Sequence, residues 1–514
     1  MPRPGGTKIL QEGRRPLCLL CLRCSVVSAG IMLSDRVRQV NARLGPDGPA
    51  RTARCKSAYN SRMPRLAWFT PLPPARSGIA TYSAEALPHL AGDHEIDVFT
   101  DQCTPGGTPA HDFVWKHLCA PYDLVVYQLG NSPAHDYMWP YLTRYPGLIV
   151  LHDAELHHAR ARALLTRGRT AEYREELRFS HPEVPPGVAD LVMANLANLL
   201  FYHWPMAGVA VRAGRLVAVH SARLRDDLAA EFGPKPIELI RMGVADPRVP
   251  AAPGVRRGPD VRAALGLPPD AVVFAAFGGV TPEKRIRQAI RALSAIRAPQ
   301  YRAHLVLVGE RASYYDALAD ARACGIEDRV RLTGYVPDED LPAYLDAADV
   351  CLCLRWPTTR ETSAAWLRCL AAGKASISTD LVHNDETPSL DPRTWTTAAA
   401  AAPPAGADPA DALKAVCVGI DILDEDHSLI LAMRRLARDG ELRADLGRRA
   451  RAWWERSHRL DHMAADYRSV IARALAAPIP DLDGLPAHLR KNGTGLAREI
   501  IAATCGRNDL LAWD

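Results

Sequence analysis

Long apolar runs are missing from this 514-residue chain, which contains no stretch of 18 or more consecutive apolar residues. A membrane-spanning helix needs such a run, so we predict no transmembrane segment. The 12 cysteines are scattered rather than regularly spaced, which argues against a disulfide framework and for a reducing compartment. With 48% hydrophobic and 24% charged residues, the composition is typical of a soluble globular protein with roughly two to four domains.

Excess positive charge is also missing from most of the chain. Residues 1–62 hold 12 Lys and Arg against three Asp and Glu, a net charge of +9, whereas the whole chain carries +5. Residues 63–514 are therefore slightly acidic, and we predict no nucleic-acid partner for them. Two interpretations of residues 1–62 stay open: a disordered leader, or upstream sequence read from too early a start before a domain that opens at Met63.

No convincing metal-binding pattern is present. Residues 18–24 read C-x-x-C-x-x-C, but no fourth ligand follows at a suitable spacing. Residues 152–158 contain three histidines and two acids after a predicted strand, in a spacing that matches no common zinc site. We favour a polar strand end with surface histidines there, with a metal site as the less favoured alternative.

Short apolar runs alternate with helical stretches along most of the chain. Buried strands are predicted at residues 64–69, 95–100, 122–128, 148–151, 215–220 and 237–241, and again at 271–277, 304–309, 329–332, 350–354 and 375–378. Strands that alternate with helices form parallel sheets, so the fold class is α/β with two Rossmann-like domains. We place these domains at residues 63–245 and 261–455, joined by a linker at 246–260 that is rich in proline.

The segment 349–380 is the most informative for function. It reads as a strand, a polar loop, a helix capped by Thr362 or Ser363, and a second strand. Gly373 stands where a left-handed helix end is expected. Free N–H groups at a helix start, with the helix dipole, bind phosphate or carboxylate groups. An ordinary solvated helix start is the alternative interpretation.

Glu361 and Arg368 lie seven residues apart in this segment, close to two helical turns, so they share one helix face. Small alanines lie between them on that face and leave room for a ligand. A plain Glu–Arg surface pair is the alternative.

A second anion-binding loop follows the strand at residues 271–277. Gly278 and Gly279 come directly after this strand, and Lys284 and Arg285 stand at the start of the next helix. Two glycines followed by two cations suit a diphosphate, although the spacing of a Walker loop is missing. A solvated helix start remains the alternative here as well.

Two features of the first domain also bear on ligand binding. Gly78 lies in a Pro/Gly-rich loop after the first strand, where the backbone can approach a ligand closely, although a plain turn is equally compatible. Residues 189–206 are apolar and aromatic. Internal helix packing is the favoured interpretation, and an acceptor-side or membrane-interfacial surface is left open.

The segment 349–380 resembles the donor-sugar motif of family 4-like retaining glycosyltransferases, which have two Rossmann-like domains facing a central cleft (the GT-B type). Its closing run at residues 370–374 (LAAGK) matches that motif well. The motif usually carries two glutamates, of which the first falls on Arg360 or, with a shift of one, on Glu361. The second falls on Arg368, which resembles a variant subgroup and puts the usual recognition of ribose in question.

The resemblance implies transfer of a sugar from a nucleotide-diphosphate sugar, either a UDP- or a GDP-sugar, to an unknown acceptor with retention of configuration. It implies no bound metal and no cofactor, and a crossing helix at residues 456–476 before a tail at 477–514. His152 and Glu361 become the catalytic candidates, with His152 facing the donor sugar and Glu361 holding its hydroxyls. Predicted donor-binding residues are Gly78, Gly279, Lys284, Arg285, Val336, Thr362, Ser363 and Arg368.

Two rival functions stay open on the same scaffold. One is a nucleotide-sugar epimerase or a phosphorylase, and the other is a non-catalytic nucleotide-sugar-binding relative, which the substitution at Arg368 motivates. A fold alone does not choose among these activities. We expect a cytoplasmic protein, and peripheral attachment to the inner membrane surface is left open.

Overall fold

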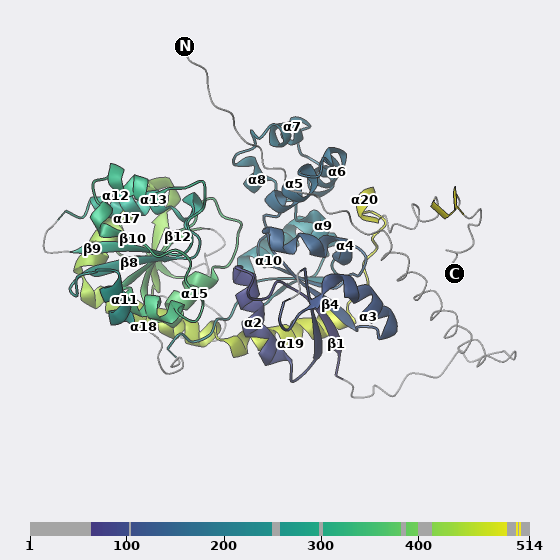
Figure 1. Ribbon diagram of the computed structural model, residues 1–514, viewed down its shortest axis with the longest axis horizontal. Coiled ribbons are helices and arrows are strands. Elements are labelled where there is room, and N and C mark those ends of the chain that lie inside the picture. The colour runs from purple at the N-terminus through teal and green to yellow at the C-terminus, as the bar shows by residue number, and fades with distance from the viewer. Residues whose placement is uncertain are drawn as a thin grey trace, which may run out of the picture. The chain divides into compact units, whose positions relative to one another are not determined.

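The computed structural model describes residues 63–101, 104–248, 257–297, 302–381, 387–398, 414–490, 500–501 and 503–504. The predictions for residues 1–62, including the cysteine run at 18–24, lie outside the described residues, as do most of the linker and most of the tail after 490. Within this range the chain forms two lobes, each built on one sheet (Figure 1).

The first lobe contains a parallel sheet whose described strands follow the order β3-β2-β1-β4-β5-β6-β7. Every residue of β4, β5 and β6 is buried, because helices cover both faces of a parallel sheet. The strands are β1 (Arg65–Phe69), β2 (Glu95–Thr100), β3 (Thr108–Pro109), β4 (Leu124–Leu129), β5 (Leu148–Leu151), β6 (Leu216–Val219) and β7 (Ile237–Leu239). Its helices are α2 (Gly78–Leu90), α3 (Phe113–Cys119), α4 (Trp139–Leu142), α9 (Gly208–Ala213) and α10 (Ala222–Phe232).

Four helices between β5 and β6 form a separate helical insert (Figure 1). They are α5 (His157–Leu165), α6 (Thr170–Ser180), α7 (Gly187–Met193) and α8 (Leu200–His203). Ala189 and Val192 are buried in the insert's own core, as the packing interpretation of residues 189–206 predicts. Leu191, Leu196 and Leu199 point outward and are exposed, so the same segment also presents apolar side chains to solvent.

The second lobe contains a larger sheet, whose described strands follow the order β10-β9-β8-β11-β12-β15-β13-β14. All of these neighbours pair in parallel except β13 and β14, which form an antiparallel edge. The strands are β8 (Val272–Phe277), β9 (Ala303–Val308), β10 (Val330–Leu332), β11 (Val350–Cys353), β12 (Ala375–Asp380), β13 (Ser389–Leu390), β14 (Thr397–Ala398) and β15 (Cys417–Asp421). The predicted α/β class with two Rossmann-like parallel sheets is confirmed.

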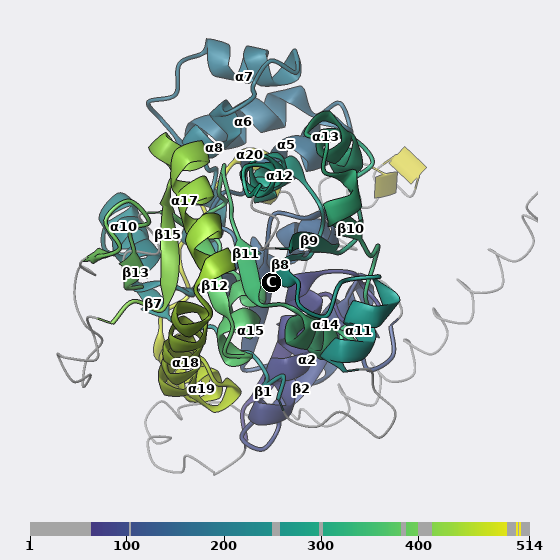
Figure 2. The ribbon, with the colours of Figure 1, turned by 90° about the vertical axis from the view of Figure 1, so that its left-hand side faces the viewer.

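Helices cover both faces of this second sheet (Figures 1 and 2). One face packs against α12 (Ile286–Ser294), α13 (Ala317–Ala323) and α17 (Glu425–Arg438), which share one apolar core with the strands. The other face packs against α14 (Leu341–Ala347), α15 (Ala364–Ala371) and residues just after α11 (Gly258–Ala264).

Two long helices lead from the second lobe back to the first. Helix α18 (Gly440–Ser457) packs on α15 and β12, and α19 (Leu460–Ala476) packs on α2, β6 and β7. The Tyr467 hydroxyl of α19 lies 2.8 Å from the hydroxyl of Tyr82 and 3.1 Å from the side-chain nitrogen of Gln128. All three side chains are buried, so this hydrogen-bonded group fixes α19 on the first lobe.

The structure departs from the sequence-based prediction in two places, the linker before the second lobe and the tail of the chain. Helix α11 begins at Gly258, inside the predicted linker, because the Asp260 carboxylate accepts the Arg257 backbone N–H at 3.0 Å and so caps the helix. In the tail, α20 (Ala487–Arg490) docks on the first lobe, where Leu485 and Leu489 join its core. The tail shows no clear periodicity, so this docking was not predictable from the sequence.

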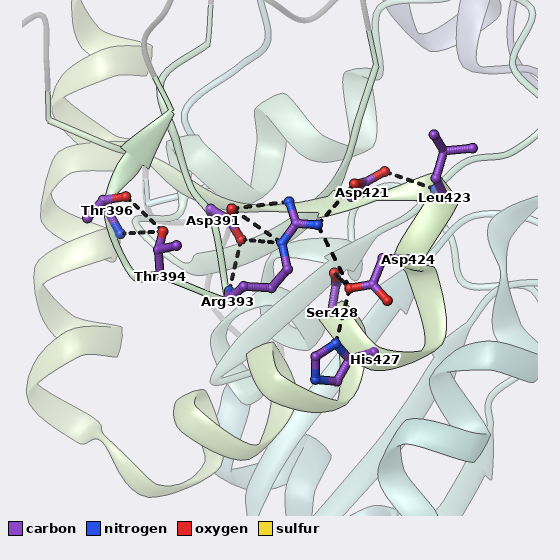
Figure 3. A network of polar contacts seen from close by, with 9 residues as sticks. All are labelled: Asp391, Arg393, Thr394, Thr396, Asp421, Leu423, Asp424, His427 and Ser428. Atoms are coloured by element: carbon purple, nitrogen blue, oxygen red, sulfur yellow. Dashed lines mark hydrogen bonds and ion pairs between the residues drawn. The ribbon is translucent and has the colours of Figure 1, made fainter.

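A polar network anchors the edge of the second sheet (Figure 3). The Arg393 guanidinium binds Asp391, 3.1 Å away in the same loop, and reaches Asp421 at the end of β15, 3.2 Å away. Asp424 in turn accepts a hydrogen bond of 3.1 Å from Ser428 at the start of α17. The loop between β13 and β14 is thereby tied to the main sheet.

Replacing Tyr467 by Phe should lower the free energy of unfolding by about 1–3 kcal/mol, because Tyr82 and Gln128 would each lose a buried hydrogen-bond partner. Urea unfolding followed by tryptophan fluorescence measures this. Tyr314, whose side chain is 72% exposed, provides the matched control, and Tyr314→Phe should change stability by less than about 0.5 kcal/mol. Equal stability of the two variants would contradict the anchoring role of Tyr467.

Candidate functional site

The loop after β8 brings a lysine against a glycine. Gly278 has a left-handed φ of +89°, and a Cβ placed there would lie 2.5 Å from the Nζ atom of Lys284. Only glycine therefore leaves space for this ammonium group, which also donates to the carbonyl oxygen of Phe277. Gly278, the first glycine of the pair seen in the sequence, thus has a packing reason.

The carboxylate of Glu361 is held in a dense set of polar contacts. Its Oε2 accepts hydrogen bonds from the Thr358 hydroxyl at 3.0 Å, the Thr359 hydroxyl at 2.7 Å and the Thr359 backbone N–H at 3.0 Å. Its Oε1 lies 2.7 Å from Nε of Arg355. Burial alone would raise the pKa of Glu361, but Arg355 and these hydrogen bonds outweigh burial, so the pKa lies below its usual value.

Helix α15 begins as the sequence predicts. The Ser363 hydroxyl accepts the backbone N–H of Trp366 at 3.2 Å, and Gly373 beyond the helix end has a φ of +67°. Thr362 precedes this cap, and both side chains face the same cavity as Glu361.

Lys284 and Glu361 line one small cavity of about 90 Å³. Its other walls come from Thr362, Ser363 and the ends of β8, β11 and β12. Burial, assisted by the positive charge of Arg355, lowers the pKa of Lys284 to about 7. The cavity is therefore lined by an amine whose pKa lies near neutral pH and by an ionised carboxylate.

A larger cavity of about 410 Å³ adjoins the first and shares Phe277 and Ala365 with it. Four predicted donor-binding residues line it: Gly78 from the first lobe, and Gly279, Val336 and Arg368 from the second. It lies where the second sheet reverses its strand order, between β8 and β11, which is the common ligand position in such sheets.

Arg285 does not join the other predicted residues. It lines neither cavity, and its Nε lies 2.7 Å from the Glu425 carboxylate at the start of α17. Its backbone has a φ of +56° where the chain turns into α12, and its side chain meets α17 instead of the cavities. The geometry gives no support to the diphosphate contact expected of Arg285 and assigns it an ion pair within the lobe.

His152 is buried at the end of β5 and lines neither cavity. Its Nε2 lies 2.8 Å from the Gln128 side-chain oxygen, and its Nδ1 lies 3.2 Å from Nε2 of His220. Burial, with the nearby His220, lowers the pKa of His152 well below its ordinary value, so the ring is neutral. Both ring nitrogens thus have protein partners, and contact with a donor sugar stays a prediction.

Contacts between the two lobes complete the site, and sequence reasoning missed them. The Thr359 hydroxyl lies 2.7 Å from the Asp153 carboxyl. The backbone carbonyl oxygen of Thr359 accepts a hydrogen bond from the Ala154 backbone N–H at 3.0 Å. Arg360 pairs with Glu155 at 3.0 Å. The sequence marked both polar segments, at residues 152–158 and 355–362, but no local signal shows that they meet.

Arg368 makes a further contact between the lobes. Its guanidinium lies 2.8 Å from the carboxylate of Glu85 on α2, and both side chains are largely buried. The arginine at the expected second glutamate position therefore has a carboxylate partner from the opposite lobe.

The described residues contain no cluster of three or more His, Cys, Asp or Glu side chains that could hold a metal ion. His157, from the candidate metal segment, has its Nε2 only 2.6 Å from the Tyr173 hydroxyl, in the core of the helical insert. Within the described residues, the segment 152–158 therefore forms no such cluster. Among the helices described, none has both the length and the apolar character needed to cross a bilayer.

Two Rossmann-type sheets with cavities at their strand ends define the GT-B class of fold. Sucrose-phosphate synthase from Thermosynechococcus elongatus superposes with a TM-score of 0.52 at 15% identity, covering 81% of this chain and 100% of that one. Anabaena HepE, solved in complex with UDP, gives a TM-score of 0.50 at 16% identity, covering 80% and 100%. At these identities the likeness shows the fold.

The sequence of the second lobe is similar to that of one group of proteins with this fold. Residues 271–413 match the family model described as glycosyl transferases group 1, and this range includes Lys284, Glu361 and Arg368. The 2-deoxystreptamine glucosyltransferase of Streptomyces kanamyceticus is 29% identical over 147 residues. That alignment covers 28% of this chain and 37% of the relative, so the chain matches little more than a third of the relative's length.

Replacing Glu155 by Gln should change how stability depends on pH. Burial raises the pKa of Glu155 to about 7 despite the Arg360 partner, so the folded protein keeps this proton to a higher pH than the unfolded chain does. The unfolding free energy of the wild type should therefore fall, by up to about 1.4 kcal/mol per pH unit, between pH ~4.5 and ~7. Glu155→Gln should lack this fall.

Urea unfolding at a series of pH values measures the effect. The exposed Glu339 serves as the control, since Glu339→Gln should leave the pH dependence of the wild type intact. Parallel curves for wild type and Glu155→Gln would show that Glu155 titrates normally.

Proposed function

We propose that this protein is a retaining, metal-independent glycosyltransferase of the family 4-like type, which transfers a sugar from a nucleotide-diphosphate sugar to an acceptor. One observation carries this proposal: Lys284 and Glu361 share a cavity that also includes the start of α15. The match of residues 271–413 to group 1 glycosyl transferases supports the same assignment.

The diphosphate of the donor would bind between Lys284 and the start of α15. A bound phosphate would restore the proton on Lys284, because a nearby anion favours the charged ammonium form. The free N–H groups of α15 add a second positive potential. Together they would stabilise the charge that develops on the leaving diphosphate, which is the step where such electrostatic help is largest.

The remaining parts of the donor follow from this position. Glu361 would hold hydroxyls of the sugar, and the nucleotide would occupy the larger cavity beside Val336 and Arg368. Contacts between the lobes, such as Arg360 with Glu155, would keep water away from the reacting bond. His152 would contact the donor sugar only if the sugar displaces Gln128 or His220 from its ring nitrogens.

We further propose a cytoplasmic site of action, which the free state of all the described cysteines supports. The acceptor is proposed only as a sugar-accepting hydroxyl group, with UDP-sugars as the first donors to test because Anabaena HepE was solved with UDP.

Replacing Lys284 by Met should weaken UDP binding by about 10- to 100-fold, since a charge-assisted contact to phosphate is lost. Calorimetry at pH 8 in buffers of different ionisation enthalpy should also show proton uptake when UDP binds the wild type, and none in the variant. Arg285→Met is the matched control and should bind UDP like the wild type, because Arg285 lies outside both cavities. Equal affinities of the wild type and Lys284→Met would refute the diphosphate site.

Product analysis separates transfer from the rival activities. A thermal-shift screen first identifies a nucleotide sugar that raises the melting temperature. Incubation of that donor with and without candidate acceptors should release the nucleoside diphosphate faster when an acceptor is present. An epimerised donor, or a sugar phosphate formed with inorganic phosphate, would favour the other enzymes, and binding without any turnover would favour a non-catalytic relative.

A further inference from the structure

One hydroxyl group lies between two carboxyl groups where the lobes meet. The Thr359 Oγ1 atom is 2.7 Å from Oδ1 of Asp153 in the first lobe and 2.7 Å from Oε2 of Glu361 in the second. Both distances are those of good O–H···O hydrogen bonds. All three side chains are at least half-buried, so bulk water does not take over either contact.

A count of hydrogens limits the protonation states of this trio. A hydroxyl group has one hydrogen and can donate it to only one neighbour, while an ionised carboxylate can only accept. If both carboxyl groups were ionised, one of the two short contacts would join two acceptors. One of the carboxyl groups must therefore carry a hydrogen and donate it to Thr359.

The contacts of Glu361 identify it as the ionised partner. Besides Thr359, it accepts from Thr358 and pairs with Arg355, so its oxygens already face donors. Asp153 has a different environment: its Oδ2 accepts the Asn131 backbone N–H at 2.8 Å, and no ion pair within the described part of the chain reaches it. Burial, followed by the negative charge of Glu361, raises the pKa of Asp153.

We propose that Asp153 is a positioning residue that holds a proton and, by donating through the Thr359 hydroxyl, fixes Glu361 and joins the two lobes. The inference rests on the proposed function only for the role of Glu361 in holding the donor. The arrangement itself follows from the positions of the three side chains. Its consequence is that loss of a single proton weakens both the position of Glu361 and the contact between the lobes.

Several charged and titratable groups surround Asp153 and act on this proton. Arg355 opposes it with a positive charge, whereas Glu361 favours it with a negative charge. Glu155 adds its negative charge only at higher pH, because burial raises its own pKa to about 7. His135 lies close to Asp153. A Cβ placed at Gly130 would be 3.1 Å from the Nε2 atom of His135 and also 3.1 Å from the Oδ2 atom of Asp153. Burial lowers the pKa of His135 to about 4, so this ring is neutral near pH 7 and adds no charge.

The test compares the pH dependence of stability in the wild type, Asp153→Asn and Asp153→Ala. An asparagine amide can donate to Thr359 and accept from Asn131, as the protonated carboxyl does, but it does not titrate. Because folding holds the Asp153 proton above the ordinary pKa of aspartate, the wild type should lose stability relative to Asp153→Asn as pH rises from about 4. Asp153→Ala should be less stable than Asp153→Asn at every pH.

Glu361→Gln distinguishes the two sites that could hold the proton. Under the proposal, Asp153→Asn removes the loss of stability with rising pH. Glu361→Gln reduces that loss without removing it, because burial alone still raises the pKa of Asp153. The opposite result, with Glu361→Gln removing that loss, would overturn the assignment to Asp153. Curves that stay parallel for the wild type and Asp153→Asn would overturn the shared proton altogether.

Thr359 supplies a second, independent check. Thr359→Ser keeps the hydroxyl and should retain the pH behaviour of the wild type. Thr359→Val places a methyl group between two carboxyl groups and should change that behaviour, because the hydroxyl no longer links them, while burial and Glu361 still act on Asp153. UDP binding to the wild type, measured in parallel, separates a failure of the proposed function from a failure of the role proposed for Asp153. Failure to bind any nucleotide refutes the proposed function, while the stability curves alone decide the role of Asp153.

Discussion

The candidate site depends on charged groups that are taken out of water and given partners. Lys284, Glu361 and Asp153 are all largely buried, and burial pushes each of them toward its neutral form. Glu361 keeps its charge because Arg355 and two threonines face it, whereas Asp153 and Lys284 lack comparable partners. One desolvated region therefore holds groups whose pKa values have moved in opposite directions. Such separation is what acid–base and anion-binding sites need at neutral pH.

Much of the fold was readable from the sequence. Short apolar runs fix buried strands, and the predicted strands at residues 148–151, 350–354 and 375–378 correspond to β5, β11 and β12. The Ser363 cap and the left-handed Gly373 were also predictable, because both depend on the local backbone. The sequence did not show the docking of α20, which has no periodicity of its own and depends on apolar contacts far along the chain.

The candidate site was readable only in part, for a physical reason. Sequence reasoning named Lys284 in the loop after β8, and Glu361 and Ser363 just before α15, and these three residues line one cavity. It did not foresee that Arg285 pairs with Glu425, because the backbone turn before α12 and this partner lie beyond any local pattern. It also missed the partners Asp153 and Glu85, since contacts between lobes join segments more than 200 residues apart.

The path of α19 has a consequence for how the chain acquires its structure. This helix begins more than 200 residues beyond the last strand of the first lobe, yet it covers part of that lobe's sheet and binds Tyr82 through Tyr467. During synthesis the first lobe leaves the ribosome with this apolar face uncovered, and it stays so until almost the whole chain has been made. Nascent chains of this length are therefore candidates for chaperone binding at the surface that α19 later occupies.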